Sequence, residues 1–127
     1  MRIALIQQAA GDDRRANCER GLRALREAAA QGAQVVCFEE LAFDPFYPQR
    51  PATEDTVARA ETIPGPTTEA FATLAAQLGV VVVLNLFERE GGRTFDTTQV
   101  LGSDGRLLGR TRMVHITEYP CFHEQGY

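Results

Sequence analysis

The chain has 127 residues, of which 44% are hydrophobic, and this is enough material for the buried core of one ordinary domain. Its formal net charge is -4 and no basic patch appears along it, so the composition argues against nucleic acid and against an anionic membrane surface as partners. No apolar run is long enough to cross a bilayer, and the first one is too short for a signal peptide.

The cysteines and the basic residues narrow the setting further. Cys18, Cys37 and Cys121 are an odd number at wide spacing without a CxxC pair, which indicates neither a disulfide framework nor a thiolate zinc site. A reducing, cytosolic location therefore fits best. Lysine is absent, because all 13 positions counted as lysine or arginine are arginine.

The first elements expected are a strand and a helix. Residues 3–7 predict a short buried strand, and Asp12 or Asp13 is suited to cap the helix that follows. Apolar residues then recur at helical spacing from Cys18 to Ala29, which predicts a helix that runs to about residue 30.

A second strand is expected over residues 35–38, directly before Glu39 and Glu40. A strand, helix, strand order with a continuous apolar second strand predicts a parallel pair buried on both faces. The two acids then lie at the C-terminal end of a parallel strand, which is the edge where open α/β sheets usually bind ligands.

The rest of the chain completes a mixed sheet. Residues 44–66 hold five of the six prolines and predict a long loop, a kind of segment that tends to be functional. Pro66 suits the first turn of a second helix, which residues 80–87 follow as a third strand. Residues 94–101 and 107–116 predict an antiparallel hairpin at the far side of the sheet.

Glu39 and Glu40 are the sharpest chemical feature of the sequence. Successive strand residues face opposite ways, so one of the two acids can point into the crevice of the sheet while the other points away. A partly dehydrated carboxylate there would have its pKa raised toward the range of a general base. The alternative interpretation is a solvated loop start, as charged residues are rarely buried.

The C-terminal segment gathers several reactive side chains, namely His115, Glu118, Cys121, His123 and Glu124. A metal site is not predicted, because a soft or borderline ion needs three or four converging ligands and Cys-x-His alone is weak. Cys121 beside a histidine allows a thiol nucleophile. A small half-buried thiol next to a proline is the simpler interpretation, and Cys18 and Cys37 are expected to pack in the core.

Five segments taken in order resemble the N-terminal half of the nitrilase, or carbon-nitrogen hydrolase, superfamily. They are "MRIALIQQ", "GAQVVCFEELAFDPFYP", "IPGPTTEAFATLAAQLGVVVVLNLFERE", "GSDGRLLGR" and "RMVHITEYPCFHEQGY", and together they cover essentially all of the chain. The subgroup it is most similar to cleaves N-carbamoyl compounds and aliphatic amides.

The resemblance implies a fold, an activity and an assembly. Residues 1–127 would form the N-terminal part of a single domain, half of an α-β-β-α sandwich with a mixed sheet and two helices on one face. The intact protein would hydrolyse a small amide or N-carbamoyl substrate through a cysteine thioester, without a metal or another cofactor. The family usually forms homo-oligomers, and no nucleic-acid or membrane partner is expected.

The resemblance also assigns residues. Glu40, directly before Leu41, matches the general base of the family, and Glu124 matches its second glutamate, which requires the two carboxylates to converge. Met113 stands where the family has a lysine that stabilises the oxyanion, and Arg112 or His115 is a possible replacement. The nucleophilic cysteine of the family lies downstream of this segment, so this chain alone is expected to be inactive.

Two rival interpretations remain. A degenerate nitrilase-like interaction subunit would keep the fold without the chemistry, and the missing lysine and cysteine favour it. A generic α/β domain that uses Cys121 and His123 by itself is the other.

Overall fold

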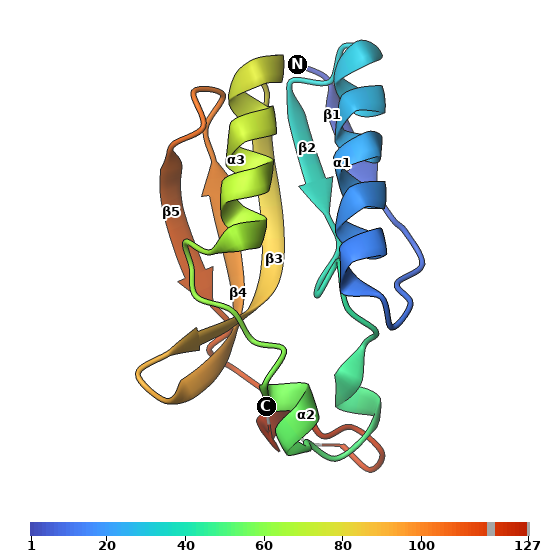
Figure 1. Cartoon of the computed structure of the whole chain (residues 1–127), viewed down its shortest axis with the longest axis vertical. Helices are drawn as coiled ribbons and strands as arrows, with labels where there is room; N and C mark the ends of the chain where they lie inside the picture. Colours follow the sequence, from blue (N-terminus) through green and yellow to red (C-terminus); the bar gives the residue numbers. More distant parts are fainter. Residues whose placement is uncertain (117–118, 127) are drawn as a thin grey trace.

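A computed structural model describes residues 1–116 and 119–126 (Figure 1). The elements in chain order are β1 (Ile3–Ile6), α1 (Arg14–Ala30), β2 (Val35–Phe38), η1 (Tyr47–Gln49), α2 (Glu54–Val57), α3 (Pro66–Leu78), β3 (Val81–Glu90), β4 (Arg93–Leu101), β5 (Leu107–Arg112) and η2 (Glu124–Gly126). One five-stranded sheet has the order β1-β2-β3-β4-β5. The first three strands are parallel, and β4 and β5 add antiparallel pairs. The predicted mixed α/β architecture is confirmed.

Helices α1 and α3 lie side by side on one face of the sheet, as expected (Figure 1). Asp13 caps α1 by accepting a hydrogen bond from the N–H of Ala16, and α3 has Pro66 in its first turn and ends at Gly79 with φ +68°. Gly21 of α1 lets the Phe43 ring approach, because a Cβ there would lie 2.6 Å from that ring. Local sequence signals therefore place both helices correctly along the chain.

The core lies between these helices and the sheet. Alternate residues of β2 and β3 point into it, such as Val36 of β2 and Leu84 of β3, both fully buried. Three phenylalanine rings fill its centre with centroid separations of 5.0 to 5.7 Å: Phe38, Phe43 and Phe71. Cys18 packs against this cluster, as expected.

The opposite face of the sheet is open. Ile3 and Leu5 of β1 are 53% and 79% exposed, and Cys37 of β2 is half-buried on the same face. The prediction of a parallel pair buried on both faces is wrong for this chain, because α1 and α3 cover one face only. The expectation that Cys37 packs in the core fails for the same reason.

Two strand boundaries differ from those predicted. Strand β3 continues past Phe87 to Glu90, since Glu88 is fully buried and ion-paired to Arg110 and Arg112. Strand β5 ends at Arg112 instead of residue 116. The predicted loop over residues 44–66 contains the short helices η1 and α2.

Candidate active site

The end of β2 sends its two acids in different directions. Glu39 Oε1 accepts a hydrogen bond from the Gln8 N–H at 3.0 Å, which ties β2 to the chain leaving β1. Glu40 instead lines a cavity on the open face of the sheet. The strand alternation therefore gives Glu39 a structural contact and leaves the Glu40 carboxylate available for chemistry.

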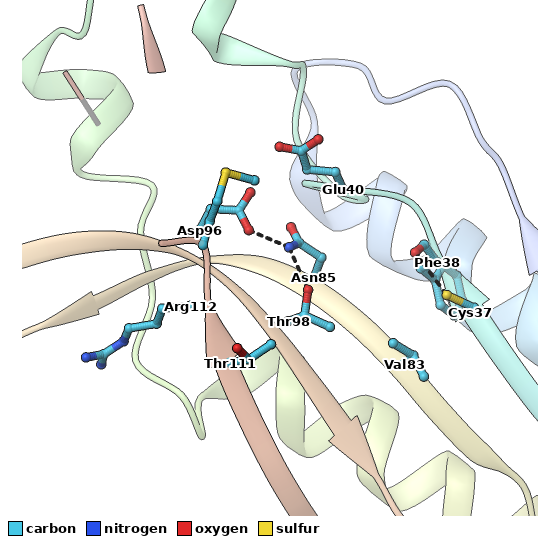
Figure 2. A pocket seen from close by; sticks show the side chains of 10 residues that line it. Cys37, Phe38, Glu40, Val83, Asn85, Asp96, Thr98, Thr111 and Arg112 are labelled. Carbon is cyan, nitrogen blue, oxygen red and sulfur yellow. Dashed lines mark hydrogen bonds between the residues drawn. The ribbon is translucent and has the colours of Figure 1, made fainter. Parts of the chain in front are cut away.

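Glu40 belongs to a group of three carboxylates from distant parts of the chain. Asp96 comes from β4 and Glu124 from η2, and one carboxylate oxygen of each of the three residues lies within 4.8 Å of the others. Figure 2 shows the carboxylates of Glu40 and Asp96 side by side above Asn85 of β3. Glu40 and Glu124, the two site residues predicted from the sequence, are thus brought together, and Asp96 joins them.

A cavity of about 360 Å³ opens beside this group (Figure 2). Its walls come from β2 to β5 and the residues next to them: Cys37, Phe38, Glu40, Val83, Asn85, Asp96, Thr98, Thr111, Arg112 and Met113. A smaller cavity of about 50 Å³ adjoins it and shares Asp96 and Met113. The acid cluster therefore lies between the larger cavity on the open face of the sheet and the smaller, mainly apolar cavity.

Glu124 reaches the cluster because the C-terminal segment packs on the long loop. The His123 N–H donates to Pro48 O at 2.7 Å, and the Phe122 ring lies 5.5 Å from that of Phe46. A tight turn closed by the Phe122 N–H and Tyr119 O precedes this contact. The loop over residues 44–66 thus has a role in building the site.

Partial burial and repulsion between carboxylates raise the proton affinity of Glu40 and Glu124. Glu40 is exposed as a whole residue, but partial burial of its carboxyl group and then the neighbouring carboxyl groups of Asp96 and Glu124 raise its pKa to about 7. The pKa of Glu124 is also raised, by burial and by Asp96. Near neutral pH part of the Glu40 population is therefore ionised and able to accept a proton, as a general base must be.

No cation neutralises this group within the described residues. Met113 lines both cavities and offers no charge. The Arg112 guanidinium is bound to Glu88 and Glu90 and stacks 3.8 Å from the centre of the Phe95 ring. Figure 2 shows it directed away from Glu40, so in this arrangement Arg112 does not replace the family lysine.

The other C-terminal candidates do not join the site. His115 is exposed and lines neither cavity. Cys121 is an exposed free thiol at a turn with φ +68°, and no hydrogen bond joins it to His123 in the described part of the chain. Glu118 and Tyr127 lie outside the described residues.

The three carboxylates are also the group that could share a metal ion within residues 1–116 and 119–126. Three oxygen donors of this type suit a hard cation. Clusters of exposed acids are common without an ion.

Sequence reasoning missed Asp96 and Asn85. Both are polar residues in the middle of strands, and Asp and Asn are depleted in strands, so their placement was an available signal. The alternation around Asp96 predicts a strand and gives no sign of a site. The distance between Asp96 and Glu40 follows from the strand order β2-β3-β4, which the spacing of residues along the sequence does not give.

Comparison with known proteins identifies the family. Residues 2–126 match the carbon-nitrogen hydrolase family, and the chain belongs to that family. Its relatives include N-carbamoylputrescine amidase of Solanum lycopersicum, 32% identical over 98% of this chain and 42% of that protein. The omega-amidase of Xenopus tropicalis is 30% identical over 91% of this chain and 40% of that protein.

A solved structure shares the fold. The crystal structure of carbon-nitrogen hydrolase from Helicobacter pylori G27 matches with a TM-score of 0.90 and 25% sequence identity, over 98% of this chain and 43% of that one. The chain therefore spans less than half the length of these two curated relatives and of this structure. Among the described residues, no helix is long and apolar enough to span a membrane.

Proposed function

We propose that Glu40 is the general base of a carbon-nitrogen hydrolase that, as an intact protein, cleaves a small amide or N-carbamoyl compound. The observation that carries the proposal is the convergence of the Glu40 and Glu124 carboxylates beside a cavity on the open face of the sheet. The amidases among the relatives support this substrate class.

The nucleophile would be a cysteine outside residues 1–127, brought to the open face by the remainder of the same domain. Glu40 takes the thiol proton while the sulfur attacks the amide or carbamoyl carbon. The carbon-nitrogen bond breaks, and the proton leaves with the released ammonia or amine. Glu40 then takes a proton from the water that attacks the thioester, the carbon-sulfur bond breaks, and Glu40 returns this proton to the departing sulfur, which restores the thiol.

Glu124 would hold the nitrogen side of the substrate, since its carboxylate is an acceptor next to the base. Met113 cannot donate a hydrogen bond to the oxyanion of the tetrahedral intermediate. The proposal therefore requires an oxyanion donor other than the side chain at position 113. Loss of a single such donor costs about 3 to 4 kcal/mol of transition-state stabilisation, so this requirement is a strict one.

The test is ammonia release by the full-length protein from a panel of amides and N-carbamoyl compounds. Glu40→Gln should lower kcat/KM at least about 100-fold, because a positioned general base contributes on that order. Glu39→Gln is the matched control, since the new side-chain amide retains an acceptor for the Gln8 N–H. Equal rates for the wild type and Glu40→Gln would remove Glu40 from the chemistry.

A non-catalytic nitrilase-like subunit is the second candidate. Met113 at the lysine position and the carboxylate group without a cation partner among the described residues favour it. The gene sequence beyond codon 127 and the same ammonia assay separate the two. A downstream cysteine after a strand together with turnover supports the enzyme, whereas an inert full-length protein supports the subunit.

Two further proposals concern the setting. A cytosolic location is supported by three free cysteines, Cys18, Cys37 and Cys121. Homo-oligomer formation is proposed from the family and is checked by sedimentation of the full-length protein. Neither nucleic acid nor a membrane is proposed as a partner, in keeping with the net charge of -4.

A further inference from the structure

Asn85 of β3 contacts both β4, which carries Asp96, and the turn after β2, which carries Glu40. It lies on the open face of β3 and is 8% exposed. Its Oδ1 accepts a hydrogen bond from the Leu41 N–H at 2.8 Å. Its Nδ2 donates to Asp96 Oδ1 at 2.6 Å and to Thr98 Oγ1 at 3.1 Å (Figure 2). The whole amide group is thus used in contacts around Glu40.

The contact with Leu41 acts on the backbone next to Glu40. Leu41 has φ +49°, in the left-handed region that residues with a Cβ seldom occupy. Such a conformation persists when its surroundings hold it, and the Asn85 amide binds the N–H of this residue. The direction in which Glu40 leaves the strand end is therefore coupled to Asn85.

The contact with Asp96 orients a second carboxylate toward Glu40. Asp96 Oδ1 is taken by Asn85, while Oδ2 is buried and has no hydrogen-bond donor within the described residues. A buried carboxylate oxygen without a donor is unfavourable. One carboxylate oxygen of Glu40 lies within 4.8 Å of one of Asp96, so a small side-chain movement would let a proton carried by Glu40 supply that donor.

We propose that Asn85 is a positioning residue that holds the Asp96 carboxylate against Glu40, and that Asp96 thereby controls the protonation of Glu40. This inference rests on the proposed role of Glu40 as the base. Burial contributes most to the raised pKa of Glu40, and Asp96 is the next contributor, acting through its charge and through contact. With Asp96 held in place, Glu40 is a stronger base than an isolated surface carboxylate.

The first test is a carboxyl titration by carbon NMR on the full-length protein, with the Glu40 signal assigned by its loss in Glu40→Gln. Asp96→Asn should lower the pKa of Glu40 by about one unit, because a neighbouring negative charge disappears. Asp12→Asn is the matched control, with the same change of charge at an exposed loop residue. An unchanged Glu40 titration in Asp96→Asn overturns the proposal.

The second test asks whether Asp96 acts through its contact with Asn85. In an Asn85→Ala background the Asp96→Asn change should shift the pKa of Glu40 by less than about half as much, because Asp96 is no longer held. A circular-dichroism melt checks that each variant is folded. Equal shifts in the two backgrounds would reduce Asn85 to a packing residue and overturn its positioning role.

The two proposals fail separately. The titration needs no turnover, so it reads the Asn85-Asp96-Glu40 link even in an inactive protein. If the protein is active, the acid limb of the kcat/KM profile should move down by the same amount in Asp96→Asn. Full activity of Glu40→Gln would show that Glu40 is not the catalytic base. If Asp96→Asn shifts the titration of Glu40 but leaves the acid limb of the kcat/KM profile unchanged, the protonation of Glu40 does not control catalysis.

Discussion

At the scale of single residues, adjacent acids have different fates because the strand alternates. Glu39 is tied to Gln8, whereas Glu40 faces two other carboxylates. The sequence located Glu40 at the ligand-binding edge, since that needs only the position of one strand. It did not indicate that Asp96 would be its neighbour, because a long loop, α3 and β3 separate the two residues along the chain.

The raised pKa of Glu40 predicts a pH-dependent contribution to stability. Its folded value of about 7 lies above the ordinary value of 4.5, so the folded state binds this proton more tightly than the unfolded chain does. The stabilisation is complete below about pH 4.5 and is lost as the pH rises through 7. Relative to Glu40→Gln, the full-length wild type should therefore lose free energy of unfolding across this interval.

Urea denaturation at a series of pH values measures this difference. The comparison with Glu40→Gln isolates one group, because carboxylates with lowered pKa, such as that of Glu88, change stability in the opposite direction. Parallel curves for the two proteins from pH 4.5 to 7 would show that the folded structure does not perturb the Glu40 carboxyl.

At the scale of elements, the antiparallel part of the sheet depends on a buried charge. Glu88 of β3 is fully buried, accepts a hydrogen bond from Thr97 Oγ1 at 2.6 Å and is bound by Arg110 and Arg112. Hydrogen bonding from Arg112 lowers the pKa of Glu88 most, against the effect of burial. These contacts also hold the Arg112 guanidinium in a direction away from Glu40 (Figure 2).

Removing that charge should destabilise the protein. Glu88→Gln leaves two arginines facing a neutral buried group, and about 3 kcal/mol of unfolding free energy should be lost, as for broken buried ion pairs. Glu90→Gln is the matched control with the same arginine partners but a 52% exposed side chain, and it should cost clearly less, because solvent screens an exposed ion pair. Equal losses in denaturant titrations would contradict this account.

At the scale of the whole molecule, the chain forms a layer of helices on a sheet whose other face is open. Exposed apolar side chains such as Ile3 and Leu5 occupy that face, and the acid cluster stands on it. The chain matches 43% of a longer hydrolase chain of the same fold. Apolar patches of this kind favour association.

Residues 1–127 produced alone should therefore self-associate in sedimentation experiments. Leu5→Glu should reduce that association, because it places a charge on the open face. Gln77→Glu is the matched control. It adds the same charge at an exposed position of α3, on the helical side of the molecule and not on the open face of the sheet. A monomeric wild-type chain, or equal effects of the two changes, would contradict the prediction.

The sequence by itself determined the order of the main helices and strands and the position of Glu40 at the end of a strand. The cap at Asp13, the stop at Gly79 and the apolar run before Glu40 are local signals, and local signals report local backbone states. The resemblance to the carbon-nitrogen hydrolases added Glu124 and the placement of both helices on one face of the sheet.

Only the tertiary structure decided which side chains meet. Asn85 and Asp96 join Glu40 because β3 pairs with β2 and β4 pairs with β3. Glu124 reaches them because the C-terminal segment packs on the loop after β2. Charge, burial and proton affinity depend on distances through space. Those distances come from the packing of strands and loops far apart in the chain, so no spacing along the sequence contains them.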